Sequence, residues 1–162
     1  MQSCEIRLCR AFLEKRRWIR LRTFIAIELE EETKAQLAEV QAEVEKLCRR
    51  GNYTPKENFH LTLHFLGEVQ EEDLDYLHEA IYETARRNRP FTMTIDKIGF
   101  FPRGNKGILW AGIERSNHLQ RLFSTLEKSL EQQGFARERK GLSPHILLMC
   151  REAFGWSRCV FL

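Results

Sequence analysis

The residues of this chain best suited to acid–base chemistry are two histidines in apolar segments. His60 opens the run HLTLHFLG, and His145 lies in the run SPHILLM. An imidazole titrates near neutral pH, so it can take up or release a proton during a reaction. Thr62, two residues after His60, adds a hydroxyl that can donate a hydrogen bond to an oxyanion. This combination predicts a site that moves protons and binds a negatively charged group.

The apolar run around His60 predicts a strand, in which side chains alternate between two faces. His60, Thr62 and His64 would share one face, and the leucines between them the other. The spacing His-x-x-x-His would bring two metal ligands together on a helix, but on a strand the two side chains stand roughly 13 Å apart. We therefore expect no metal here, and we interpret His64 as a residue at the edge of a cleft or facing solvent.

These motifs resemble those of the 2H phosphoesterase superfamily, named for two His-x-Thr/Ser motifs, and most closely those of the RNA 2′,3′-cyclic phosphodiesterases, also called 2′-5′ RNA ligases. The similarity runs from Arg22 to about Leu148 and rests on RTFIAIEL, YTPKENFHLTLHFLGEV, FPRGNKGILWAGI and GLSPHI. It implies that His60 protonates the leaving oxygen, that His145 activates water and that Thr62 binds the phosphate.

The resemblance also implies a substrate and a reaction. RNA ends or cyclic nucleotides would be the partners, and a 2′,3′-cyclic phosphate would be hydrolysed to a 2′-phosphate without a cofactor. The reverse reaction would join RNA through 2′-5′ linkages, and it would exchange the acid and base roles of the histidines.

The second motif departs from the family pattern. Leu147 stands where the family has a threonine, and Cys150 where it has an arginine. Arg151 comes one residue later; strict alternation would place it on the face of His145 and in reach of the phosphate, whereas a bulge would shift it. Two other interpretations therefore stay open, a catalytically impaired protein that binds RNA ends and a metal-dependent hydrolase.

Several other side chains are candidates for binding RNA. Arg103, in a predicted turn, could contact a phosphate. Five aromatic residues could stack on a nucleobase: Phe59, Tyr53, Phe100, Phe101 and Trp110. For Phe101 and Trp110 we favour a place in the core, because they alternate with small or charged neighbours.

A succession of strands and helices is predicted to position these residues. Apolar periodicity predicts strands at 24–29, around His60, at 91–101 and 108–113, and around His145, with helices at about 30–50, 71–87 and 116–133. The first helix would bury Leu37, Val40, Val44 and Leu47. Ser116 or Asn117 would cap the third helix, and Gly134 follows its end.

This order of elements predicts an α+β fold, in which each half presents a helix, a loop, a strand and a histidine. The family resemblance implies two pseudo-symmetric lobes of mostly antiparallel sheet, with helices on the outer faces of two small sheets and the histidines across a central cleft. We expect residues 22–162 to form this single bilobal domain with an atypical, truncated C-terminus. Residues 1–21, with their cluster Lys15, Arg16, Arg17 and Arg20, would be a flexible extension rather than an RNA-binding arm.

Composition limits the class of protein. The 162 residues carry a formal net charge of +3, which permits an anionic partner without requiring one. The five cysteines form no C-x-x-C pair, so we expect a reduced, cytoplasmic protein. No apolar stretch reaches the roughly 18 residues of a membrane helix, and no secretory signal is recognisable. We expect a monomer.

Overall fold

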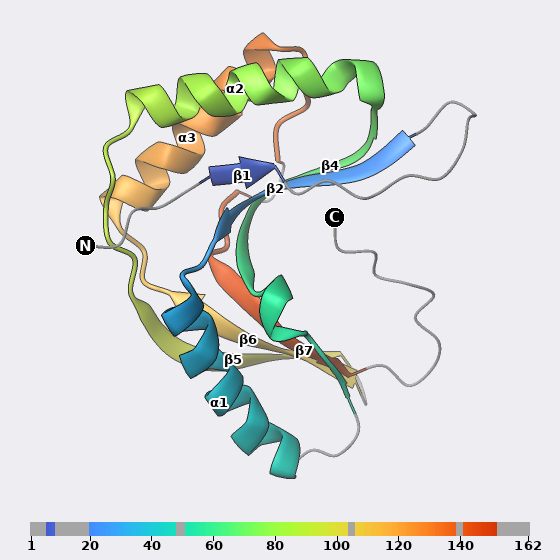
Figure 1. Cartoon of the computed structure of the whole chain (residues 1–162), viewed down its shortest axis with the longest axis vertical. Coiled ribbons are helices and arrows are strands. Elements are labelled where there is room, and N and C mark those ends of the chain that lie inside the picture. Colours follow the sequence, from blue (N-terminus) through green and yellow to red (C-terminus); the bar gives the residue numbers. More distant parts are fainter. Residues whose placement is uncertain (1–5, 9–19, 48–50, 104–105, 139–140, 152–162) are drawn as a thin grey trace.

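The computed structural model describes residues 6–8, 20–47, 51–103, 106–138 and 141–151 (Figure 1). Two short 3-10 turns, Lys56–Asn58 and Glu71–Asp73, connect its elements. The three helices are α1 (Glu31–Leu47), α2 (Leu74–Arg87) and α3 (Asn117–Gln132). The strands are β1 (Ile6–Leu8), β2 (Arg20–Glu28), β3 (Asn52–Tyr53), β4 (His60–Gln70), β5 (Ile95–Arg103), β6 (Lys106–Ile113) and β7 (His145–Arg151).

The strands form one antiparallel sheet in the order β1-β2-β4-β7-β6-β5, and β3 also pairs with β7. The two halves of the chain meet where β4 pairs with β7, and this pairing is limited to Leu61 and Ile146. The α+β fold with an antiparallel sheet is therefore confirmed. The two small sheets expected for the lobes are joined into a single sheet by this one residue pair.

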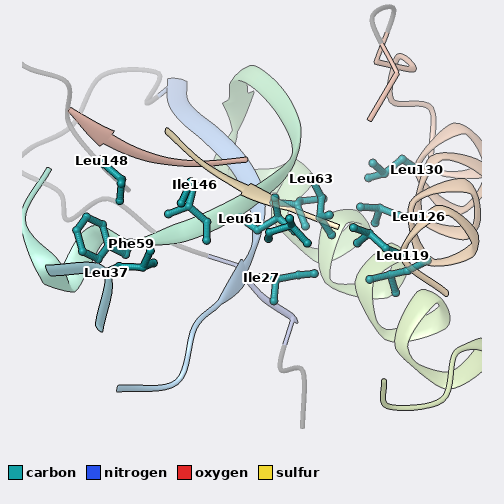
Figure 2. Close-up of a cluster of buried hydrophobic side chains, with 14 of the residues drawn as sticks. Ile27, Leu37, Phe59, Leu61, Leu63, Leu119, Leu126, Leu130, Ile146 and Leu148 are labelled. Atoms are coloured by element: carbon teal, nitrogen blue, oxygen red, sulfur yellow. The ribbon is translucent and has the colours of Figure 1, made fainter. Parts of the chain in front are cut away.

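The helices and one face of the sheet enclose a single apolar core. Figure 1 shows α2 and α3 next to each other at the top of the view and α1 at the bottom. Figure 2 shows Leu37 of α1 near Phe59 and Leu148 at one end of the core, and leucines of α3 at the other. Leu61 and Ile146, both fully buried, lie between them. The core therefore extends across both halves of the sheet.

The ends of α3 follow the predicted signals. Ser116 is the N-cap, and its hydroxyl accepts a hydrogen bond from the backbone N–H of Leu119 at 3.1 Å. Gly134 lies beyond the helix with a φ of 88°, a conformation that glycine adopts without steric cost. Both predictions are confirmed.

The predicted apolar stripe of α1 is wrong in part. Val40 is exposed, and Leu47 is 89% exposed. The helix is turned so that Lys34 and Leu37 are buried, with Gln41 and Val44 following on the same side. Two polar residues therefore occupy positions that face the sheet.

The predicted N-terminal extension contributes to the sheet. Ile6–Leu8 pairs antiparallel with residues 25–27 of β2, so this part of residues 1–21 is not a separate appendage. The basic cluster at residues 15–17 and the C-terminal residues 152–162 lie outside the described residues. Within the described ranges, no helix is long and apolar enough to cross a membrane.

Candidate functional site

The pair Leu61 and Ile146 brings the two histidine motifs together. Both side chains point into the core, so the residues directly before and after each of them lie on the opposite face of the sheet. We call these four residues the histidine face: His60 and Thr62 on β4, and His145 and Leu147 on β7.

The register fixes how the four residues of the histidine face are arranged. Around an antiparallel pair of Leu61 with Ile146, Thr62 lies across from His145, and His60 lies across from Leu147. The two histidines therefore occupy diagonal corners of the histidine face, one on each strand.

His60 is held on the histidine face by the ring of Phe24 and by the backbone of Asn58. Its imidazole is half-buried and stacks on Phe24 of β2, with ring centroids 4.9 Å apart. Burial lowers the pKa of His60 below its ordinary value, the hydrogen bond to the backbone of Asn58 raises it in part, and the positive charge of Lys34 lowers it further. The net effect favours a neutral His60 near neutral pH.

His145 is held in a similar way. Its Nδ1–H donates a hydrogen bond to the carbonyl of Ser143 at 2.7 Å, which leaves Nε2 as the nitrogen for chemistry. Its ring has edge contacts with Phe101 and Trp110, at centroid distances of 5.9 and 6.4 Å. In both motifs the backbone group that binds the ring lies two residues before the histidine.

Each motif contains a β-bulge at the same position. In β4, Leu63 is the extra residue, because β2 pairs with Thr62 and then with His64. In β7, Leu148 is the extra residue, because β6 pairs with Leu147 and then with Met149. Each bulge therefore falls three residues after its histidine, and the alternation of side chains changes beyond it.

The first bulge makes the prediction for His64 wrong. His64 is 3% exposed and lies on the core side of the sheet, where its Nδ1 is 2.5 Å from Oε1 of Glu127 on α3. The other oxygen of Glu127 accepts the backbone N–H of Glu138 at 2.9 Å. His64 thus does not share a face with His60. Among the described residues, no group of three or more His, Cys, Asp or Glu side chains could hold a metal ion.

Because of the second bulge, side-chain alternation along β7 no longer predicts that Arg151 lies on the face of His145. Met149 follows Leu148 into the core, so strict alternation from His145 does not hold along β7. The backbone of Arg151 pairs with Gly107, at the opposite end of β7 from His145. The backbone of Arg103 pairs with Lys106 at the same end of the sheet. The side chains of both arginines lie outside the described part of the structure, and their phosphate contacts stay predictions.

Phe59 is wrong as a base-stacking candidate. It is 1% exposed in the core, because a residue directly before His60 points to the opposite face. Tyr53 is half-buried and packs against the core. Its stacking on a base stays a prediction.

Phe101 is wrong as a core residue. It is 40% exposed and stacks on the half-buried Trp110, with ring centroids 4.9 Å apart. Gly99 makes room for the indole, because a Cβ at Gly99 would lie 2.1 Å from Cζ2 of Trp110. Phe101 and Trp110 thus form an aromatic ledge beside His145.

Sequence reasoning missed Lys34. This residue is 3% exposed, and its Nζ lies 3.3 Å from carboxylate oxygens of both Glu28 and Glu31. Glu28 pairs with His60 in the register of β2 and β4, so the ammonium lies beside the first histidine. The signal was present, because Lys34 precedes Leu37 by three residues and so lies on the same side of the helix.

Gln41, on the same side of α1, was also missed. Its Nε2 donates hydrogen bonds to the carbonyls of Thr54 at 2.8 Å and of Leu148 at 2.7 Å. The backbone N–H of Thr54 donates to the carbonyl of Leu148 as well, at 2.9 Å. Gln41 therefore ties α1 to the strand that carries His145.

Comparisons with known proteins find similar sequences and structures. The family model described as LigT like phosphoesterase matches residues 27–110, which include His60 and Thr62. The RNA 2′,3′-cyclic phosphodiesterase of Thermotoga maritima is 37% identical over 132 residues, 79% of this chain and 68% of that protein. The enzyme of the same name from Thermus thermophilus is 34% identical over 140 residues, 82% of this chain and 70% of that protein.

Solved structures are similar over most of the chain. The crystal structure of the Thermus thermophilus protein TT0787 matches with a TM-score of 0.72 and 31% identity, covering 85% of this chain and 76% of that one. The structure of E. coli LigT in complex with 3′-AMP matches with a TM-score of 0.61 and 28% identity, covering 83% and 74%.

Proposed function

Since this chain belongs to the LigT-like phosphoesterase family, we propose that it is an RNA 2′,3′-cyclic phosphodiesterase that opens cyclic phosphate ends to 2′-phosphates. The observation that carries this proposal is the diagonal placement of His60 and His145, with Thr62 beside them, on one face of the sheet. The binding of 3′-AMP by E. coli LigT supports a nucleotide as the ligand of this face.

The reaction needs one imidazole in each protonation state. A neutral histidine takes a proton from water as the water oxygen forms a bond to phosphorus. The bond from phosphorus to the 3′ oxygen breaks on the opposite side, and a protonated histidine gives that oxygen its proton. Thr62 donates a hydrogen bond to a non-bridging oxygen, which stabilises the charge of the transition state.

We assign His60 as the base and His145 as the acid, the reverse of what the family resemblance implies. The lowered pKa of His60 keeps its ring neutral near neutral pH, and a base must be neutral to accept a proton. A substrate with a leaving group that needs no proton, such as bis(4-nitrophenyl) phosphate, tests this assignment. We expect His145→Ala to keep most of its activity on this substrate and His60→Ala to lose it; the opposite pattern would restore the implied assignment.

We propose roles for the remaining candidates as well. We propose that the ledge of Phe101 and Trp110 stacks on the terminal base, because Phe101 is exposed beside His145. Arg103 and Arg151 are proposed phosphate contacts. The five cysteines form no C-x-x-C spacing, which supports a reduced, cytoplasmic setting, and we also propose this setting.

Hydrolysis of a 2′,3′-cyclic mononucleotide tests the proposed function. We expect His60→Ala and His145→Ala each to lower kcat by roughly two to four orders of magnitude. His78→Ala, an exposed histidine on α2, is the matched control and should retain full activity. Activity should survive EDTA, and chromatography should show a 2′-phosphate as the product.

The outcomes separate the competing functions. Loss of activity in EDTA would indicate a metal-dependent hydrolase. Binding of the cyclic nucleotide without turnover would indicate an RNA-end-binding protein impaired by Leu147. An undiminished rate in His60→Ala would show that the histidine face is not the active site.

A further inference from the structure

A cavity of about 450 Å³ lies away from the histidine face, where the end of α2, the start of α3 and the segment leading to β5 meet. These segments lie on the left of Figure 1. Its lining includes Arg87, Arg89, Arg121, Phe91 and His118, and we call it the arginine pocket. Its volume falls within the range of small-molecule sites.

The charges of the arginine pocket are not balanced within its lining, which contains no Asp or Glu. Arg87 donates a hydrogen bond to Glu83 on its own helix at 2.9 Å. Arg89 and Arg121 form no ion pair with any residue that the structure describes. Gathered guanidinium groups repel one another, and a phosphate relieves this repulsion through paired hydrogen bonds. The lining therefore favours an anion.

An aromatic pair adds a second kind of recognition to the pocket. The rings of Phe91 and His118 stack with centroids 5.8 Å apart and planes 22° apart. His118 is exposed, so one side of this stack is open. Aromatic and imidazole rings bind unpaired nucleobases by stacking. Arginines beside such a stack fit a phosphate and a base together, which is a nucleotide.

An RNA strand whose 3′ end lies at the histidine face could reach the arginine pocket. Gly112 pairs with His145, and His118 lies six positions after Gly112, at most roughly 20 Å of backbone away. A smaller hollow between the two includes Arg115 and Pro144, the residue before His145. A short single strand could therefore extend from the histidine face to the pocket past another arginine.

We propose that the arginine pocket binds a nucleotide of the RNA substrate upstream of its cyclic phosphate, so that the enzyme prefers RNA ends to free cyclic nucleotides. This inference rests on the proposed function. The same chemistry could recognise a free nucleotide, and the experiment distinguishes the two sources.

The test compares substrates of different length with the full chain. The variant is Arg89→Gln with Arg121→Gln, and the charge-matched control is Lys128→Gln with Arg137→Gln, two exposed cations outside the pocket. For a hexanucleotide ending in a cyclic phosphate, we expect the pocket variant to lower kcat/KM at least tenfold through KM. Its salt dependence should weaken by roughly 0.7 in log–log slope for each lost phosphate contact. Hydrolysis of a cyclic mononucleotide should be unchanged, and the control should match the parent on both substrates.

Two binding measurements, with a hexanucleotide and with 5′-AMP, complete the test of the arginine pocket. Anisotropy of a labelled hexanucleotide with a 2′-phosphate end reports binding without catalysis, so weaker binding by the pocket variant supports the site even if the protein hydrolyses nothing. Equal kcat/KM and equal binding of the hexanucleotide by variant and control would overturn the proposal. Loss of 5′-AMP binding alone, with the hexanucleotide unaffected, would also overturn it and assign the pocket to a free nucleotide.

Discussion

The buried ammonium group of Lys34 helps to lower the pKa of His60, the first of the two histidines. Its ammonium is enclosed by Glu28 and Glu31, and its position beside His60 opposes protonation of the imidazole. A base must be neutral, and the neutral form of His60 exists above its pKa. Lys34 therefore extends toward acid pH the range in which His60 is neutral.

Replacing Lys34 should shift the pH dependence of the reaction. Lys34→Met removes the positive charge and leaves Glu28 and Glu31 to favour the protonated ring, so the pKa of His60 rises. We expect the acid limb of kcat/KM to move to higher pH, while Lys34→Arg keeps it near its original position. NMR titration of His60 checks the pKa without catalysis.

Other outcomes have distinct meanings for Lys34. If His60 were the acid, the basic limb would move to higher pH instead. An unchanged titration of His60 in a folded Lys34→Met protein would show that the ammonium has only a structural role.

Leu147 should limit the rate. It lies across from His60, where the resemblance implies a threonine hydroxyl facing the phosphate, and an apolar side chain donates no hydrogen bond there. We expect Leu147→Thr to raise kcat by roughly tenfold or more, measured on a cyclic mononucleotide. Leu147→Val is the matched control, because valine has the branching of threonine without the hydroxyl. If kcat is unchanged in a Leu147→Thr variant whose structure shows the hydroxyl at a bound phosphate, the second hydroxyl is dispensable for the reaction.

Among the elements, the two bulges decide which side chains reach the histidine face. The sequence HLTLHFLG looks like uninterrupted alternation, and nothing in its residue types marks Leu63 as the extra residue. A bulge arises from how a strand matches its partner, and that match depends on the fold rather than on local preference. This is why His60 and Thr62 were predictable and the burial of His64 was not.

The hydrogen bonds of Gln41 should stabilise the second bulge. Gln41→Ala would leave the carbonyls of Thr54 and Leu148 with one donor fewer each, and we expect a loss of roughly 1–3 kcal/mol in the free energy of unfolding. Gln36→Ala, an exposed position on the same helix, should change stability by less than about 0.5 kcal/mol. Urea denaturation measures both, and equal stability of the two variants would contradict the role of Gln41.

Helices and strands were predictable where apolar periodicity is strong. The bounds of α3 follow from the sequence to within one residue, because one stripe of leucines fixes the buried side, and the cap was narrowed to Ser116 or Asn117. The orientation of α1 did not follow, because Lys34 and Gln41 are buried by partners far away in the chain. Polar residues on a buried side are recognised only when their partners are known.

For the whole molecule, the shared core should make unfolding a single transition. Leucines of α3 and α1 belong to one cluster that spans both halves of the sheet. We expect Leu126→Ala, at a fully buried position, to cost about 2–5 kcal/mol and to lower the unfolding midpoints of both halves together. Leu47→Ala, the same change at an exposed position, is the control. Two separate transitions, seen by tryptophan fluorescence and by helical circular dichroism, would contradict a single cooperative unit.

The helices tie together parts of the chain that are synthesised at different times. Gln41 of α1 binds a carbonyl 107 residues later, and His64 binds a carboxylate 63 residues later. Contacts this distant in sequence form slowly, because a long loop must close before they give any stabilisation. On the ribosome, α1 and the strand of His60 emerge first, and they wait for α3 and for the strand of His145. The proposed catalytic centre is therefore incomplete in the nascent chain until nearly all of its described residues have left the exit tunnel.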